Sequence, residues 1–151
     1  LPPAALLGWP RLPSVRAPFA GWDELAARVR AELPGVFGDG PPLVVADNYV
    51  PAAQLEHALR GSVEVLTLDH PHNVAHGRDL QYALWGRDES GLRAHAGRRV
   101  LLVLQPDRLP RAGRAAWRAH VEALFDDLRP LGSLDVPAAR TQFELLSARV
   151  R

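Results

Sequence analysis

The chain has 151 residues, of which 47% are hydrophobic and 23% are charged. This length suits one domain with a real core, because a domain of about 150 residues buries roughly 70% of its unfolded surface. The composition excludes a disordered chain. The formal net charge is +1 and all 18 basic residues are arginine. Arginine binds anions, although codon usage in a GC-rich genome explains the same bias. The sequence lacks the basic stripe with stacked aromatics that nucleic-acid binders need, so we expect no nucleic-acid partner.

The absence of cysteine excludes disulfides and thiolate metal sites. No apolar run approaches the roughly 20 residues that span a membrane, and the start carries no signal-peptide pattern. The chain begins at Leu1 and contains no methionine, which predicts a piece of a longer polypeptide.

The first half of the chain predicts an extended segment, then a helix, and then a unit of strand, helix and strand. Residues 1–20 are rich in proline and predict a surface segment, so the single α/β domain is expected over 21–151. Apolar residues at helical spacing predict a helix from Trp22 to the Pro34-Gly35 stop. Short apolar runs then predict strands over 43–47 and 63–68, joined by a helix over 51–59 that is short enough for neighbouring parallel strands.

The second half adds a strand, a long helix and a hairpin. Residues 69–79 predict a polar loop, and 80–86 predict a loop or a single helical turn. A strand over 100–104 and a helix over 111–128 follow, and 131–136 with 141–150 predict an antiparallel pair. The expected fold is therefore α/β, a three-layer sandwich with a mixed, mostly parallel sheet and a C-terminal antiparallel hairpin.

Candidate binding residues lie at the carboxyl edge of the expected sheet, where helix starts favour anions. Asp47, Asn48 and Tyr49 end the first strand there, although one of the first two could simply cap the helix while Tyr49 packs under a loop. Tyr82 and Trp85 could stack a sugar ring, and the alternative is that both belong to the core.

Three histidines, His70, His72 and His76, are weak candidates for a zinc site with Asp69 or Asp79. Their spacing matches no helical zinc signature, and Pro71, Asn73 and Gly77 favour a solvated loop with incidental histidines. We therefore expect no metal and no cofactor in this domain. His57 and His120 are expected to be partly exposed helix residues.

Catalytic motifs are not found in the sequence. It lacks a Gly-x-Ser-x-Gly elbow, a Walker loop and a Gly-x-Gly-x-x-Gly sequence after a strand. Adjacent acidic pairs at 23–24, 88–89 and 126–127 cannot converge on one point and are expected to be solvated. No catalytic residue is predicted.

The order of several short motifs resembles a known family. Gly-Trp-Asp-Glu-Leu at 21–25 precedes the strand that ends in Ala-Asp-Asn-Tyr at 46–49, the helix with Ala-Ala-Gln-Leu at 52–55, and Gln-Tyr-Ala-Leu-Trp at 81–85. This arrangement is similar to the soluble C-terminal domain of bacterial polyprenyl-phosphate-sugar glycosyltransferases, which are related to protein mannosyltransferases and aminoarabinose transferases. The similarity covers roughly residues 21–105. Residues 17–20 lack the acidic Asp-Pro start of the family, and the histidine segment replaces an arginine-bearing stretch.

The resemblance implies an accessory role. Family members are polytopic membrane proteins whose acidic catalytic residues lie outside this domain, so it is expected on the extracytoplasmic (periplasmic) face of the cytoplasmic membrane, in the cell envelope. Its expected partners are the transmembrane core of the same polypeptide and the lipid-linked sugar or acceptor. The candidate substrate-binding residues are Asp47, Asn48, Tyr49, Gln81, Tyr82 and Trp85.

Two further functions remain open from the residues alone. One is a free-standing α/β binding module for a small anionic or nucleotide ligand. The other, less favoured, is a hydrolase that uses the histidine segment and a metal.

Overall fold

The computed structural model describes residues 21–151, so the predicted proline-rich segment over 1–20 lies outside the described residues. The chain starts with helix α1, Trp22–Phe37, whose buried side chains at helical spacing include Leu25 and Val29. The helix continues past the predicted stop at Pro34. The carbonyl of Pro34 accepts the N–H of Gly38 at 2.9 Å, which closes the last turn.

Five strands form one sheet in the order β2-β1-β3-β5-β4. Strands β1 (Leu43–Ala46), β2 (Glu64–Thr67) and β3 (Arg99–Leu104) pair in parallel. Strand β5 (Thr141–Val150) is antiparallel to both β3 and β4 (Phe125–Val136), so four of the five strands run in one direction. The mixed, mostly parallel sheet with a terminal antiparallel hairpin is confirmed.

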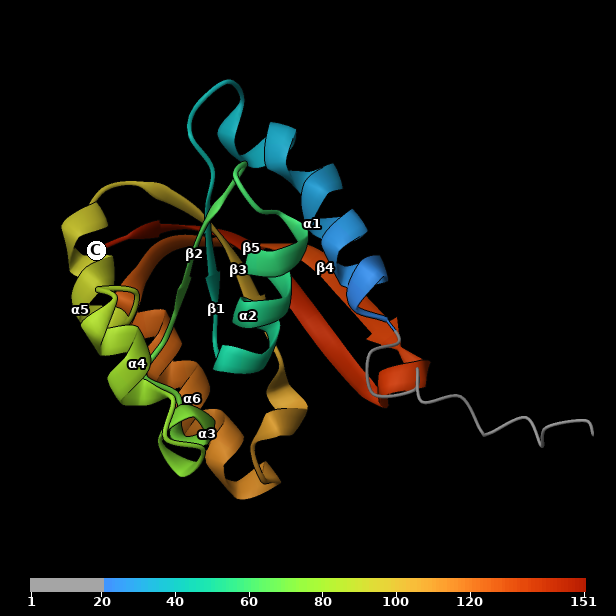
Figure 1. Ribbon diagram of the computed structural model, residues 1–151, viewed down its shortest axis with the longest axis vertical. Helices are drawn as coiled ribbons and strands as arrows, with labels where there is room; N and C mark the ends of the chain where they lie inside the picture. Colours follow the sequence, from blue (N-terminus) through green and yellow to red (C-terminus); the bar gives the residue numbers. More distant parts are fainter. Residues whose placement is uncertain (1–20) are drawn as a thin grey trace, which may run out of the picture.

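Helices cover both faces of this sheet, as Figure 1 shows. Helices α1 and α2 (Tyr49–Ala58) pack on one face against Val44 and Ala46. Helices α5 (Glu89–Leu92) and α6 (Arg111–Leu124) pack on the other face against Leu43 and Val45. Alternate residues of β1 therefore point into two separate cores, which explains why the strand is apolar throughout. The predicted three-layer sandwich is confirmed.

The predicted loop over 69–79 is wrong in part, because it contains helix α3, Pro71–Ala75, and leads into α4, Asp79–Leu84. The amide of Asn73 donates to the carbonyl of Leu68 at 2.9 Å, and its side-chain oxygen accepts the N–H of Tyr49 at 2.8 Å. The bonds to Leu68 and Tyr49 fix α3 to the end of β2 and the start of α2, because a helix of this length is not stable alone. Short 3₁₀ helices follow at Arg93–His95 (η2) and Pro106–Arg108 (η3).

The long helix α6 ends at Leu124, earlier than the predicted residue 128. Phe125 already pairs with Val150 in the sheet, so its backbone is extended although its side chain continues the helical apolar pattern. The hairpin connection contains the 3₁₀ helix η4, Pro137–Ala139, and Arg140 at φ 50°.

Candidate functional site

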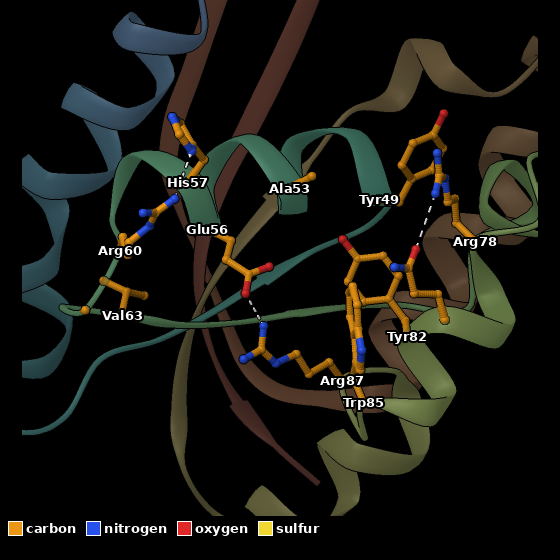
Figure 2. A pocket seen from close by; sticks show the side chains of 12 residues that line it. Tyr49, Ala53, Glu56, His57, Arg60, Val63, Arg78, Tyr82, Trp85 and Arg87 are labelled. Atoms are coloured by element: carbon orange, nitrogen blue, oxygen red, sulfur yellow. Dashed lines mark hydrogen bonds and ion pairs between the residues drawn. The ribbon is translucent and has the colours of Figure 1, made fainter.

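A cleft of about 600 Å³ opens between helix α2, the turn into β2 and helix α4. Figure 2 shows its lining side chains, with Glu56 of α2 facing Arg87 and Tyr49 of α2 lying next to Arg78. The cleft brings together four of the candidate residues from the sequence, which are Tyr49, Gln81, Tyr82 and Trp85.

Two aromatic residues form one wall of the cleft. Tyr82 is buried and packs in the α1–α2 core, whereas Trp85 is 53% exposed. Their rings lie edge to face with centroids 5.5 Å apart. Burial raises the pKa of Tyr82, so its phenol stays protonated and can donate a hydrogen bond. The wall thus combines a fixed phenol with a partly open indole ring, which an apolar sugar face could cover.

Three arginines, Arg60, Arg78 and Arg87, give the cleft a positive charge. Arg87 forms an ion pair with Glu56 across the cleft (Figure 2). Arg78 lies 5.8 Å from the centre of the Tyr49 ring and donates to Gln81 at 3.3 Å. With three arginines and one glutamate among the lining residues, the formal charge is 3 − 1 = +2 with neutral histidine. An anion is the ligand this charge favours.

Asp47 and Asn48 do not lie in the cleft. Asn48 caps helix α2, because its side-chain oxygen accepts the N–H of Val50 at 3.1 Å, and its amide donates to Asp47 at 2.9 Å and to Gln105 at 3.1 Å. The carboxylate of Asp47 also accepts the N–H of Gln105 at 3.0 Å. Both residues therefore join the carboxyl ends of β1 and β3.

Burial raises the pKa of Asp47 to about 7, and its hydrogen bonds lower it only in part. The indole N–H of Trp117 lies close enough to lower this pKa slightly, yet it makes no hydrogen bond of normal geometry and is buried without a partner. A buried carboxyl group and a buried indole N–H without a normal hydrogen bond are both rare in folded proteins, and here they lie together at the sheet edge.

The expectation of a solvated histidine loop is wrong for His70. Its side chain is fully buried, its Nδ1 accepts the N–H of His72 at 3.0 Å, and burial lowers its pKa to about 4. His72 stacks on Tyr49 with ring centroids 5.3 Å apart, and His76 lies 5.7 Å from the same ring. Within residues 21–151 no group of three or more potential ligands is placed to hold a metal ion. His57 and His120 are exposed, as expected.

The expectation that the acidic pairs are solvated is wrong for Glu89, which is buried. Its carboxylate accepts the N–H of Asp69 at 3.0 Å and lies 2.7 Å from Nε2 of His120. In return, Asp69 accepts the N–H of Glu89 at 3.3 Å. These bonds join the end of β2 to α5 and α6.

Sequence reasoning missed the arginines and Glu56 of the cleft. They come from α2, its following turn and both ends of α4, so no local spacing connects them. The general arginine excess was the only signal, and it does not single out these positions.

The large apolar side chains that are exposed in the described part belong to α3, to α4 and to the residue that follows α4. We call Val74, Leu80, Leu84 and Trp85 the α3–α4 apolar patch; they are 60%, 71%, 87% and 53% exposed. Leu80 and Leu84 are four residues apart and share one helix face. Through Trp85, this patch adjoins the cleft.

Comparisons with known proteins add little. No protein-family model and no curated protein matches the chain. The crystal structure of EvdMO1 is similar over 87% of this chain and 41% of that protein, at 12% identity and a TM-score of 0.34. A likeness at this level bears on neither fold nor function. Among residues 21–151, no helix has both the length and the apolar character needed to cross a membrane.

Proposed function

We propose that this domain binds an anionic, sugar-containing ligand in the cleft. We further propose that it is the accessory extracytoplasmic domain of a membrane-bound glycosyltransferase that uses a polyprenyl-phosphate donor, with the catalytic core outside this chain. The binding proposal rests on one observation, which is that the same cleft is lined by Trp85 and by Arg60, Arg78 and Arg87.

The two halves of the cleft suit the two halves of such a ligand. The Trp85 ring offers an apolar surface for a sugar face and lies beside Tyr82 in Figure 2. The amide of Gln81 lines the same cleft and can hydrogen-bond a sugar hydroxyl. Arginine binds phosphate through two parallel N–H bonds, and Arg60 and Arg78 have no carboxylate partner among the described residues.

The single carboxylate of the cleft fits a binding role better than a catalytic role. Glu56, the only carboxylate that lines the cleft within residues 21–151, is paired with Arg87. Glycoside hydrolases normally use two carboxyl groups that flank the scissile bond, so this single paired glutamate does not favour hydrolysis. Under this proposal, the catalytic groups belong to the transmembrane part of the parent protein.

The α3–α4 apolar patch supports a lipid-associated partner. Large exposed apolar patches mark protein or membrane contacts, and this one continues from the cleft through Trp85. A sugar in the cleft would have its lipid carrier or the transmembrane core beside it.

A second candidate function is a free-standing module for a nucleotide. The same ring and arginines could stack a base and bind its phosphate. Upstream sequence separates the two proposals, because many membrane spans with acidic loops favour the glycosyltransferase and a short soluble reading frame favours the module.

Titration of the 151-residue chain with mannose 1-phosphate, mannose, inorganic phosphate and AMP tests the binding proposal. We expect mannose 1-phosphate to bind most tightly and to shift the indole resonance of Trp85. Trp85→Ala and Arg78→Gln should each weaken this binding, whereas Arg93→Gln, outside the cleft, should not. Tighter binding of AMP would favour the nucleotide module, and no binding of any probe would refute both.

In the full-length protein, Tyr49→Ala and Trp85→Ala should lower sugar transfer more than they lower the melting temperature. Parallel losses of both would assign these side chains to folding instead.

A further inference from the structure

A second pocket, separate from the cleft, lies at the carboxyl ends of β1 and β3. Its volume is about 460 Å³, within the range of small-molecule sites, and it shares no lining residue with the cleft. We call it the switch-point pocket, since it occupies the crevice where ligands bind in open α/β sheets.

The topology explains this position. The chain leaves β1 into α2 on one face of the sheet, and it leaves β3 through η3 into α6 on the other face, as Figure 1 shows. Strands β1 and β3 are neighbours, so the chain leaves their carboxyl ends in opposite directions and a crevice opens between them.

The walls of the switch-point pocket are mostly apolar. Leu104 ends β3, Leu109 follows the 3₁₀ helix η3, and Trp117 and Val121 come from α6. Such walls favour a ring or a short hydrocarbon chain.

The inner end carries two polar groups with bonding capacity left. The Asp47 side chain is 1% exposed and accepts bonds from Asn48 and Gln105, while an ionised carboxylate has about four acceptor positions. The buried indole N–H of Trp117 lies near this carboxylate but makes no hydrogen bond of normal geometry. A hydroxyl group would suit both, because it can accept from the indole and donate to the carboxylate.

The outer end carries a cation. Arg118 is already paired with Glu122 and Glu144. Arg114 bonds only the carbonyl of Leu109 through Nε, and no carboxylate among residues 21–151 pairs with it. Its terminal nitrogens can bind the carboxylate of a ligand.

We propose that the switch-point pocket binds a small amphipathic carboxylate whose ring or chain lies between Leu109 and Trp117, with its anionic group on Arg114 and a hydroxyl at the Asp47 end. This second site is independent of the proposed function of the cleft, and neither proposal falls with the other.

Three related probes separate the parts of this proposal in the 151-residue chain. 4-Hydroxyphenylacetate carries both polar groups, phenylacetate lacks the hydroxyl, and 2-(4-hydroxyphenyl)ethanol lacks the carboxylate. We expect the first to bind with about millimolar affinity, as its size allows, and to shift the Trp117 indole resonance, which the spectrum of Trp117→Phe assigns. Each of the other two should bind about tenfold more weakly.

Matched variants locate the ligand. Arg114→Gln should weaken 4-hydroxyphenylacetate and phenylacetate about tenfold but leave the alcohol unchanged, and Arg111→Gln, on the same helix outside the pocket, should change none. Leu109→Trp should fill the pocket and abolish binding while mannose 1-phosphate still shifts Trp85. No saturable shift of Trp117 in the folded chain, a shift at Trp85 instead, or equal binding to Arg114→Gln would overturn the proposal.

Discussion

At the residue scale, buried ionisable groups set the pH dependence of this domain. Asp47 and His70 are both fully buried at the edge of the sheet, where desolvation disfavours their charged forms. Burial raises the pKa of the acid Asp47 and lowers the pKa of the base His70. Buried Asp47 therefore destabilises the fold as pH rises toward neutral, and buried His70 destabilises it as pH falls.

Asp47 should lower stability as pH rises. Its pKa is about 7 in the folded chain against 3.8 as the ordinary value, so the folded state binds more protons between these values and the free energy of unfolding falls across that window. The loss is at most on the order of 4 kcal/mol. Denaturant unfolding at several pH values should show this slope, and Asp47→Asn should remove it. The same slope in both proteins would contradict the assignment.

His70 should remain neutral down to about pH 4, because burial lowers its pKa to about that value. The unfolded chain binds this proton near pH 6.5, so stability is lost as pH falls from there to about 4. Nitrogen NMR of the histidine rings should show the proton on Nε2, since Nδ1 accepts the N–H of His72. Titration of His70 near pH 6.5 would refute this picture.

At the scale of elements, the short helices α3 to α5 depend on contacts that no local pattern contains. Helix α5 packs against the turn after α4, where a Cβ on Gly91 would come within 1.8 Å of the carbonyl oxygen of Gly86. Trp85 and Arg87, which both line the cleft, are the neighbours of Gly86 in that turn.

Gly91→Ala should therefore destabilise the domain by about 2 kcal/mol, because the backbone must shift. Gly113→Ala is the matched control, since that glycine lies in α6 with no atom within 4 Å of the added Cβ. The control should gain about 0.5–1 kcal/mol from helix propensity. Thermal unfolding of both variants measures the difference, and a neutral Gly91→Ala would show that the two turns are not in close contact.

Much of this architecture could be predicted from sequence, and the exceptions have physical causes. Strand β1 is apolar throughout because both of its faces are buried, so its pattern identified it. Helix α3 depends on Asn73 bonds to residues before it in the chain, and the end of α6 depends on the pairing of Phe125 with Val150. The aromatic residues of the cleft could be predicted because they lie in the sequence motifs. Its arginines could not, because only the tertiary fold brings them together.

At the scale of the whole molecule, the proposed binding features lie at the borders of the two cores, since Tyr82 belongs to one core and the cleft, and Val121 belongs to the other core and the switch-point pocket. The cleft and the α3–α4 apolar patch adjoin each other on the α2–α4 side, and the switch-point pocket lies under α6. We expect the patch to contribute to partner contact rather than to folding.

Leu84→Gln should test this division. The side chain is 87% exposed, so the free energy of unfolding should change by less than about 0.5 kcal/mol, whereas Leu92→Ala in the core should cost about 2–5 kcal/mol. In the full-length protein, Leu84→Gln should still lower sugar transfer. Unchanged transfer would exclude the patch from the proposed contact with the lipid carrier or the transmembrane core.

We propose above that the cleft binds an anionic sugar through Arg78 and Trp85. The most direct measurement is a calorimetric cycle that compares mannose 1-phosphate with mannose on the unmodified chain and on Arg78→Gln. We expect the two changes, removal of the ligand's phosphate and removal of the Arg78 guanidinium, to be coupled in binding free energy by at least about 1 kcal/mol, since each removes the same charged contact. Additive losses, or affinity for mannose 1-phosphate that survives Arg78→Gln and Trp85→Ala together, would contradict it.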